Sequence, residues 1–341
     1  MPPSTCARNS AGKRFLVFVE QSDVLVENNS AKVLPSLGLG TDVLMARNPR
    51  LIVVRMPSLG LSGPYAHYVG FGAHVEALCG LTARRGYRDL DVTANAGTYH
   101  MDASGTVAAF AVLAALRRRE KTGVGEVIEL AQSENLLQHI GEEILDASVV
   151  GFDRERLGNR HPTFAPQGVY PCAGEDPWIA NSVTGDAAWR SLRSLLGEPS
   201  WVMDPALETG AGRWAGHDDL DAGLARWTMT QDRDELFHRC QAAGIAAGAV
   251  LDESDLLVDP QLSARGFFRK NSSEDLGEWT FPGHLWQWDG PPLQWGRINR
   301  MGADNDYVWR DVAGLEDETC KAMQADGQLR LDYVDGNGDS M

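Results

Sequence analysis

The feature that most constrains the fold is a stretch of 14 residues without a charged side chain, Ala103–Leu116. It is too short to span a bilayer, so it predicts a buried helix of a globular protein. Asp102 precedes it, and RRREK and Gly123 follow, which is typical of a capped helix with a basic last turn. Capping alone explains an aspartate in this place, although an ionised, partly desolvated carboxylate there can also act as a nucleophile.

Short apolar runs and turn residues predict further elements around this helix. Residues 51–56, LIVVRM, form a β-run after an Asn-Pro turn, and residues 127–130 predict another strand. A Gly-rich loop without periodicity, residues 60–72, lies between them and leads into a short helix at 75–81. A further helix is expected at 134–149. This part of the chain is therefore predicted to be α/β.

The character of the sequence changes at Gly151–Pro177, where Gly, Asn, Arg, His and Pro gather as in a linker between domains. A compact α+β unit is predicted after it. Its expected elements are strands 178–183 and 246–251 and helices 187–196 and 233–243. From Pro260 the pattern changes to hairpins, and closing helices are expected at 305–313 and 317–325.

Composition excludes several classes of protein. Lys and Arg number 31 and Asp and Glu 47, for a net charge of −16, which argues against a partner nucleic acid. The five cysteines are odd in number and widely spaced, so a disulfide framework is not expected and a reducing compartment is. The first 19 residues contain a single apolar run, Phe15–Val19, which is too short for the core of a signal peptide. We therefore expect a cytoplasmic protein without a membrane segment.

Common ligand motifs are missing from the sequence. It contains neither GxGxxG nor a Walker A loop, and GLSGP at 60–64 lacks the spacing of a nucleophile elbow. The eight histidines form no HExxH or i,i+4 pair, so no metal is expected.

A series of segments, in order along nearly the whole chain, resembles the family III CoA-transferases, which include formyl-CoA transferase, carnitine CoA-transferase and benzylsuccinate CoA-transferase. The segments are SDVLVEN (22–28), LGLG (37–40), NPRLIVVRM (48–56), GLSGPYA (60–66), MDASG (101–105), AALRRREKTGVGEVIEL (114–130), GNRHP (158–162), PQGVYPC (166–172), AAGIAAGAV (242–250), DPQLSARGFF (259–268) and MGADNDYVWRDVAGL (301–315).

The resemblance implies an unusual α/β fold. In the family, a discontinuous Rossmann-like large domain is built from both ends of the chain, a small α+β domain is inserted between them, and two subunits interlock. On this basis we expect the large domain in residues 1–155, a linker in 156–177, the small domain in 178–259 and a return segment completing the large domain in 260–341.

The resemblance also implies the chemistry. These enzymes move CoA from an acyl-CoA donor to a carboxylate acceptor, and their essential aspartate matches Asp102. Its carboxylate would attack the thioester to give a mixed anhydride, and the CoA thiolate would then form an aspartyl-CoA thioester. The substrates are CoA thioesters and carboxylic acids, without a metal.

Residues for CoA follow from the same resemblance. The VEN segment of the family lines the CoA pocket, which implies a contact for Asn28, and Ser36 and Leu37 match the part that packs the adenine end. Lys32, Arg47 and Arg50 are cations that could meet phosphates, although a solvated surface role is the simpler interpretation.

Two alternatives stay open. The family begins with a strand–helix–strand portion that has no counterpart here, so this chain could be a non-catalytic or partner subunit that pairs with a homologous chain rather than with a second copy of itself. The family also holds α-methylacyl-CoA racemases, which place a His-Asp pair where this sequence has Gly70-Phe71-Gly72. Phe71 can be neither acid nor base, and His74 lies three positions further on.

Overall fold

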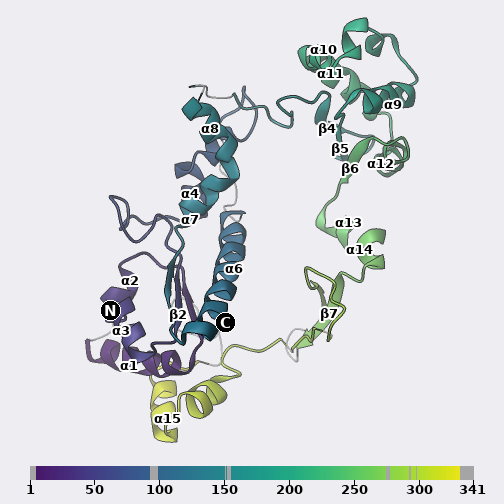
Figure 1. The fold of residues 1–341 in the computed structure, drawn as a ribbon. Coiled ribbons are helices and arrows are strands. Elements are labelled where there is room, and N and C mark those ends of the chain that lie inside the picture. Colours follow the sequence, from purple (N-terminus) through teal and green to yellow (C-terminus); the bar gives the residue numbers. More distant parts are fainter. Residues whose placement is uncertain are drawn as a thin grey trace.

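The computed structural model describes residues 5–92, 99–149, 151, 155–273, 277–291, 293–296 and 298–330, with the backbone alone for 5–11 and 99–102. Figure 1 shows three successive parts along the chain: a lobe around β2, a smaller lobe that carries β4 to β6, and an arm through β7 that returns toward α1.

The first lobe is built on a parallel sheet in the order β1-β2-β3, made of β1 (Val24–Glu27), β2 (Ile52–Arg55) and β3 (Val127–Glu129). The expected strands at 51–56 and 127–130 are thus confirmed. Strand β2 is buried along its whole length because both faces of the sheet are covered. Val53 packs toward Leu34 and Leu44, while the other face contacts the long helix α6.

Two crossovers join the parallel strands. The first contains α2 (Val33–Ser36) and α3 (Thr41–Arg47), and the second contains α4 (Gly72–Leu78), α5 (Leu81–Arg84) and α6 (Tyr99–Thr122). After β3 follow α7 (Gln132–Leu137), the 3-10 turn η1 (Gln138–Ile140) and α8 (Gly141–Val149), where the sequence predicted one helix over 134–149.

Helix α6 corrects two expectations. Its backbone begins at Tyr99, so Asp102 lies in the first turn and is not the N-cap. The helix is also buried on one side only: Ala108 and Ala115 pack on the sheet, whereas Phe110 is 74% exposed. One face of a sheet buries only one side of a helix. The remaining apolar side chains of α6 would need a second structural layer to be buried. The predicted end of the helix is confirmed, because Gly123 follows it with φ +76°.

The smaller lobe is an antiparallel sheet in the order β4-β5-β6, with β4 (Gln167–Pro171), β5 (Trp178–Ser182) and β6 (Ala246–Val250). Its core includes Trp189 and Leu224. The helices are α9 (Asp186–Leu196), α10 (Gly210–Ala215), α11 (His217–Thr228) and α12 (Arg233–Ala242), with 3-10 turns η2 (Ser200–Val202) and η3 (Pro205–Glu208). Strand β4 lies inside the expected linker 156–177, since pairing with β5 makes it part of this lobe.

The arm contains α13 (Glu253–Val258), α14 (Pro260–Ala264), the hairpin β7 (Phe268–Ser273) and β8 (Gly277–Pro282), the π-helix η4 (Tyr307–Val312) and α15 (Asp317–Ala325). Its end contacts α1 (Thr5–Gln21), a helix that the sequence did not predict. The rings of Phe18 and Trp309 meet edge to face at 5.3 Å, and the Gln21 amide donates to the Val312 carbonyl at 2.8 Å. Helix α1 and the last part of the arm therefore pack together.

The resulting path is an open hoop (Figure 1). A compact protein of this mass exposes about 14,000 Å², whereas this chain exposes 21901 Å². Within the described residues, no helix combines the length and the apolar character needed to cross a membrane.

Candidate active site at the carboxyl edge of the parallel sheet

The loops that leave the three parallel strands meet at one edge of the first lobe. Asn28 follows β1, Pro57 opens the loop after β2, and Gln132 follows β3. Because a crossover helix runs antiparallel to the strands that it joins, the first turn of α6 lies at this same edge. Helix α6 there packs against α4 and α7 (Figure 1). Asp102 and Asn28 are thus brought to the same edge of the sheet, although the Asp102 side chain lies outside the described residues.

A pocket of about 420 Å³ opens at this edge. Asn28, Asn29 and Ser30 line it from the loop after β1, Ser58 and Tyr68 from the loop after β2. Its described lining contains amides, hydroxyls and apolar groups and no charged side chain. Such a lining suits a chain of alternating amide and methylene groups better than a phosphate.

The other two residues expected to contact CoA lie outside this pocket. The Ser36 hydroxyl donates to the Val33 carbonyl at 2.8 Å, and Leu37 is the exposed residue that ends α2. Val33, at the other end of α2, does line the pocket. Helix α2 therefore leads from the pocket to Ser36 and Leu37.

Of the three candidate cations, only Lys32 lies beside the pocket, between the lining residues Ser30 and Val33, and it is exposed. Arg47 pairs with Glu20 at 2.5 Å. Arg50 precedes β2 at the opposite edge of the sheet, where it donates to the Gly123 carbonyl at 3.1 Å.

A buried ion pair that sequence reasoning missed lies beneath the Asn28 loop. Glu27 and Arg55 are cross-strand partners at the ends of β1 and β2, and Arg55 Nε donates to Glu27 Oε1 at 2.6 Å. The second Glu27 oxygen accepts the Asn29 N–H at 2.9 Å, and Arg55 Nη2 donates to the Ala31 carbonyl at 3.1 Å. The pair therefore holds the backbone on which Asn28 stands.

The predicted Gly-rich loop is confirmed as irregular and is anchored by side chains that the sequence did not single out. Gly60 has φ +90°, and the next N–H, of Leu61, donates to Glu129 Oε1 at 2.6 Å. The Ser58 hydroxyl donates to the Gly70 carbonyl at 3.1 Å. His74, the residue of interest for a racemase, is exposed and accepts the Phe71 N–H at its Nδ1 at 3.1 Å, which makes it part of the start of α4.

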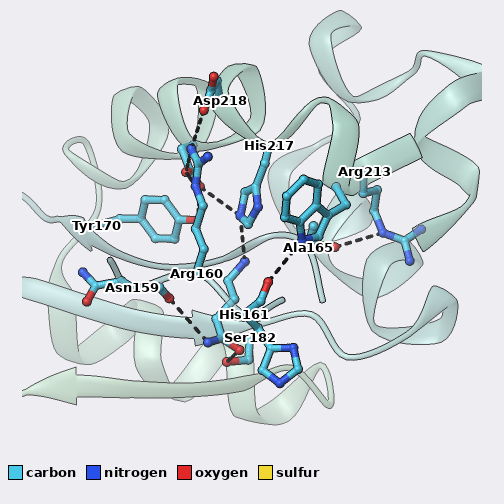
Figure 2. Close-up of polar contacts among 12 residues, drawn as sticks. Asn159, Arg160, His161, Ala165, Tyr170, Ser182, Arg213, His217 and Asp218 are labelled. Carbon is cyan, nitrogen blue, oxygen red and sulfur yellow. Dashed lines mark hydrogen bonds and ion pairs between the residues drawn. The ribbon is translucent and has the colours of Figure 1, made fainter. Parts of the chain in front are cut away.

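The GNRHP motif belongs to a second polar cluster, in the smaller lobe (Figure 2). Arg160 donates to Asp221 Oδ2 through Nε at 2.9 Å, and the Tyr170 hydroxyl donates to Asp221 Oδ1 at 2.7 Å. His217 accepts the Gln167 N–H at Nε2, so its proton is assigned to Nδ1, and burial lowers its pKa. These contacts fix the segment to α11 and leave the cluster a structural role.

Metal ligation finds no support in the described part of the chain, where no group of three or more His, Cys, Asp or Glu could hold an ion. Cys79, Cys172, Cys240 and Cys320 are free and buried, and burial raises the pKa of the first three thiols. Groups of this kind are poor nucleophiles.

Comparison with known proteins agrees with the motifs. Residues 8–305 match the sequence model of CoA-transferase family III. The chain is 30% identical over 318 residues to succinyl-CoA–D-citramalate CoA-transferase of Chloroflexus aurantiacus, a match that covers 90% of this chain and 77% of that one. It is 31% identical to the succinyl-CoA–L-malate CoA-transferase beta subunit of the same organism, covering 91% and 78%. A CaiB/BaiF family protein from Brucella suis has the same fold, with TM-score 0.79 at 23% identity over 89% of this chain and 79% of that one.

Proposed function

Since the chain belongs to CoA-transferase family III, we propose that it moves CoA from an acyl-CoA donor to a carboxylic acid, with Asp102 as the nucleophile. The observation that carries this proposal is the shared edge of the sheet, to which the parallel topology brings both the first turn of α6 and the neutral pocket beside Asn28. The relatives that are named for succinyl-CoA and a hydroxy dicarboxylic acid make dicarboxylates the first acceptors to test.

The proposed reaction proceeds through four exchanges at carbonyl carbons. The Asp102 carboxylate attacks the thioester, the C–S bond breaks, and a mixed anhydride and CoA thiolate result. The thiolate attacks the Asp102 carbonyl and expels the donor acid, which leaves an aspartyl-CoA thioester. The acceptor carboxylate attacks that thioester and releases the thiolate again. The thiolate finally attacks the acceptor carbonyl, which restores the Asp102 carboxylate.

Charge supports the proposed place of each reactant. An ordinary aspartate is ionised at neutral pH, so no base is needed to generate this nucleophile. We place the pantetheine arm of CoA in the uncharged pocket beside Asn28, the phosphates at Lys32, and the adenine end toward Ser36 and Leu37. In a chain with a net charge of −16, a cation at the rim of the pocket lowers the repulsion that CoA would otherwise meet.

A partner subunit completes the proposal. Counting 100° per residue, position 102 falls on the same stripe of α6 as Leu113, which is 66% exposed. A thioester or anhydride on that stripe would be hydrolysed unless water were excluded. We propose that two chains interlock in the cytoplasm, each a discontinuous Rossmann-like domain with a small inserted domain. The partner is a second copy or a homologous chain, as in the relative named as a beta subunit.

The decisive experiment traps CoA on the protein. The chain is incubated with succinyl-CoA, treated with hydroxylamine, and analysed by peptide mass spectrometry for a hydroxamate. We expect the label at Asp102, and transfer that falls by more than about a thousandfold in Asp102→Asn, because a covalent nucleophile is lost. Asp42→Asn is the matched control, since Asp42 also lies in the first turn of a helix, α3, within the same lobe.

Three outcomes would contradict the proposal. Transfer by Asp102→Asn within about tenfold of the parent would remove the role of Asp102. Exchange of an α-proton with deuterium from solvent, without transfer, would instead indicate a racemase. Neither activity, together with binding to a homologous chain, would indicate a partner subunit.

A further inference from the structure

One short segment, residues 127–135, makes hydrogen bonds to three separate parts of the candidate site. Glu129 binds the Gly-rich loop through the Leu61 N–H. Gln132 Nε2 donates to the Met56 carbonyl, at the carboxyl end of β2, at 2.7 Å. The third side chain, Asn135, reaches the start of α6. The segment thus connects the pocket to the helix that carries Asp102.

The contact of Asn135 with α6 is buried. Asn135 Nδ2 donates to Ser104 Oγ at 3.3 Å, Asn135 is 9% exposed, and Ser104 is fully buried. Ser104 lies two residues after Asp102 on α6 and begins the stripe that faces the sheet. The next members of that stripe, Ala108 and Ala115, offer only apolar contact. Arg119, in the last turn of α6, binds the Asp23 and Arg50 carbonyls and so holds the far end of the helix.

We propose that Asn135 is a positioning residue that fixes the place of Asp102 through the Ser104 hydroxyl. The inference rests on the proposed function. Small apolar side chains give a helix attraction without direction, and Arg119 fixes only the far end of α6. The alanines alone would therefore let the start of α6 tilt or rotate slightly against the sheet. A hydrogen bond between two buried groups favours one position of α6 along its axis and one rotation about it. Any other placement would leave a buried polar group unpaired, which costs free energy.

The expected effect on catalysis follows from the steps themselves. The Asp102 carbonyl must meet the thiolate and then the acceptor carboxylate in near-attack geometry, and a displacement of about 1 Å costs about a hundredfold in rate. Binding of the CoA arm depends on the pocket beside Asn28 and stays unchanged. Loss of the Asn135–Ser104 bond is therefore expected to lower kcat and to leave the KM for acyl-CoA unaltered.

The test compares Ser104→Ala, Asn135→Ala and the double variant in the full chain. Ser104→Ala removes one oxygen from a helical position and keeps the fold. Ser182→Ala is the matched control, because Ser182 makes a similar bond to an amide side chain, that of Gln167 at 3.1 Å, in the other lobe. Amide hydrogen exchange of residues 103–107 reports on the helix start, and steady-state transfer reports on kcat and KM.

We expect exchange at residues 103–107 to be at least about tenfold faster in both single variants and unchanged in Ser182→Ala. Transfer should lose about tenfold to a hundredfold in kcat with KM within about threefold. The double variant should be no worse than either single variant, as for two partners of one bond.

Unaltered exchange in both single variants would overturn the inference, and so would unaltered kcat or additive losses in the double variant. A parent chain that transfers no CoA would refute the proposed function instead. The exchange experiment would then still decide whether Asn135 holds the start of α6.

Discussion

Replacing Glu27 by Gln tests whether the buried pair with Arg55 supports the pocket. The substitution keeps the shape of the side chain and removes its charge. Arg55 is left as an uncompensated buried cation, and the Gln amide must place an N–H₂ group against one of two donors, Arg55 Nε or the Asn29 N–H. Removing one partner of a buried pair costs about 3–5 kcal/mol in the free energy of unfolding.

The size of this effect in a melting experiment follows from the length of the chain. An unfolding entropy of about 2.1 cal/mol/K per residue gives about 0.7 kcal/mol/K for a cooperative unit of 341 residues. A loss of about 3–5 kcal/mol therefore lowers the melting temperature by about 4–7 °C. The KM for acyl-CoA should also rise, because the loop that carries Asn28 loses one of two supports. Either the Asn29 N–H loses its acceptor, or Arg55, which binds the Ala31 carbonyl, loses its own.

The assay is calorimetry at one fixed protein concentration, since association shifts melting. Glu120→Gln is the control, because Glu120 pairs with Arg117 at 2.8 Å with both side chains mostly exposed. Such a pair contributes about 0–1 kcal/mol. Equal melting temperatures for Glu27→Gln and Glu120→Gln would refute the argument that burial and register make the first pair different.

Two further predictions concern the smaller lobe and its junction. The buried His217 resists protonation while the unfolded chain does not, so its lowered pKa implies stability that is complete above pH 6.5 and falls below it, by at most about 1.4 kcal/mol per pH unit. In urea titrations between pH 6.5 and 5, His217→Gln should lose stability less steeply than the parent, and equal slopes would contradict this. Gly158→Ala should destabilise by about 2 kcal/mol or more, because Gly158 has φ +60° and a Cβ would lie 2.4 Å from the Tyr87 ring. Gly123→Ala meets no neighbour at φ +76° and should cost less; equal losses would show that the ring contact is irrelevant.

The sequence predicted the elements whose signal is local. LIVVRM forms the central buried strand, Gly123 ends α6, and the Gly-rich loop is irregular. Asp102 and Asn28 came from motif resemblance, and their common edge follows from the parallel topology. The elements that the sequence did not predict depend on contacts between residues that lie far apart in the chain. Helix α1 has only a weak apolar pattern of its own. Its Phe18 packs against Trp309, almost 300 residues away, so a local reading of the sequence does not reveal this contact.

The ion pair beneath the pocket shows the same limit. Glu27 and Arg55 are charged residues that end short strands, a position usually exposed to water. The register of β1 on β2 places the two side chains opposite each other. The resulting ion pair offsets the cost of burying both charges. The sequence predicts a linker where strand β4 forms, because the Gly and Pro residues of this strand mask its alternation of buried and half-buried positions. Pairing with β5 completes the strand.

The contacts between α1 and the arm have a consequence for the order of events during synthesis. The Arg14 guanidinium donates to Gln328 at 2.9 Å, a separation of 314 residues. Helix α1 therefore cannot pack against the arm until residues near Gln328 have left the ribosome, so the hoop closes last. If two hoops are linked, pairing has to precede this closure. Exchange of subunits would then be limited by the rate at which Arg14 and Phe18 release the end of the chain, however weak the remaining interface is.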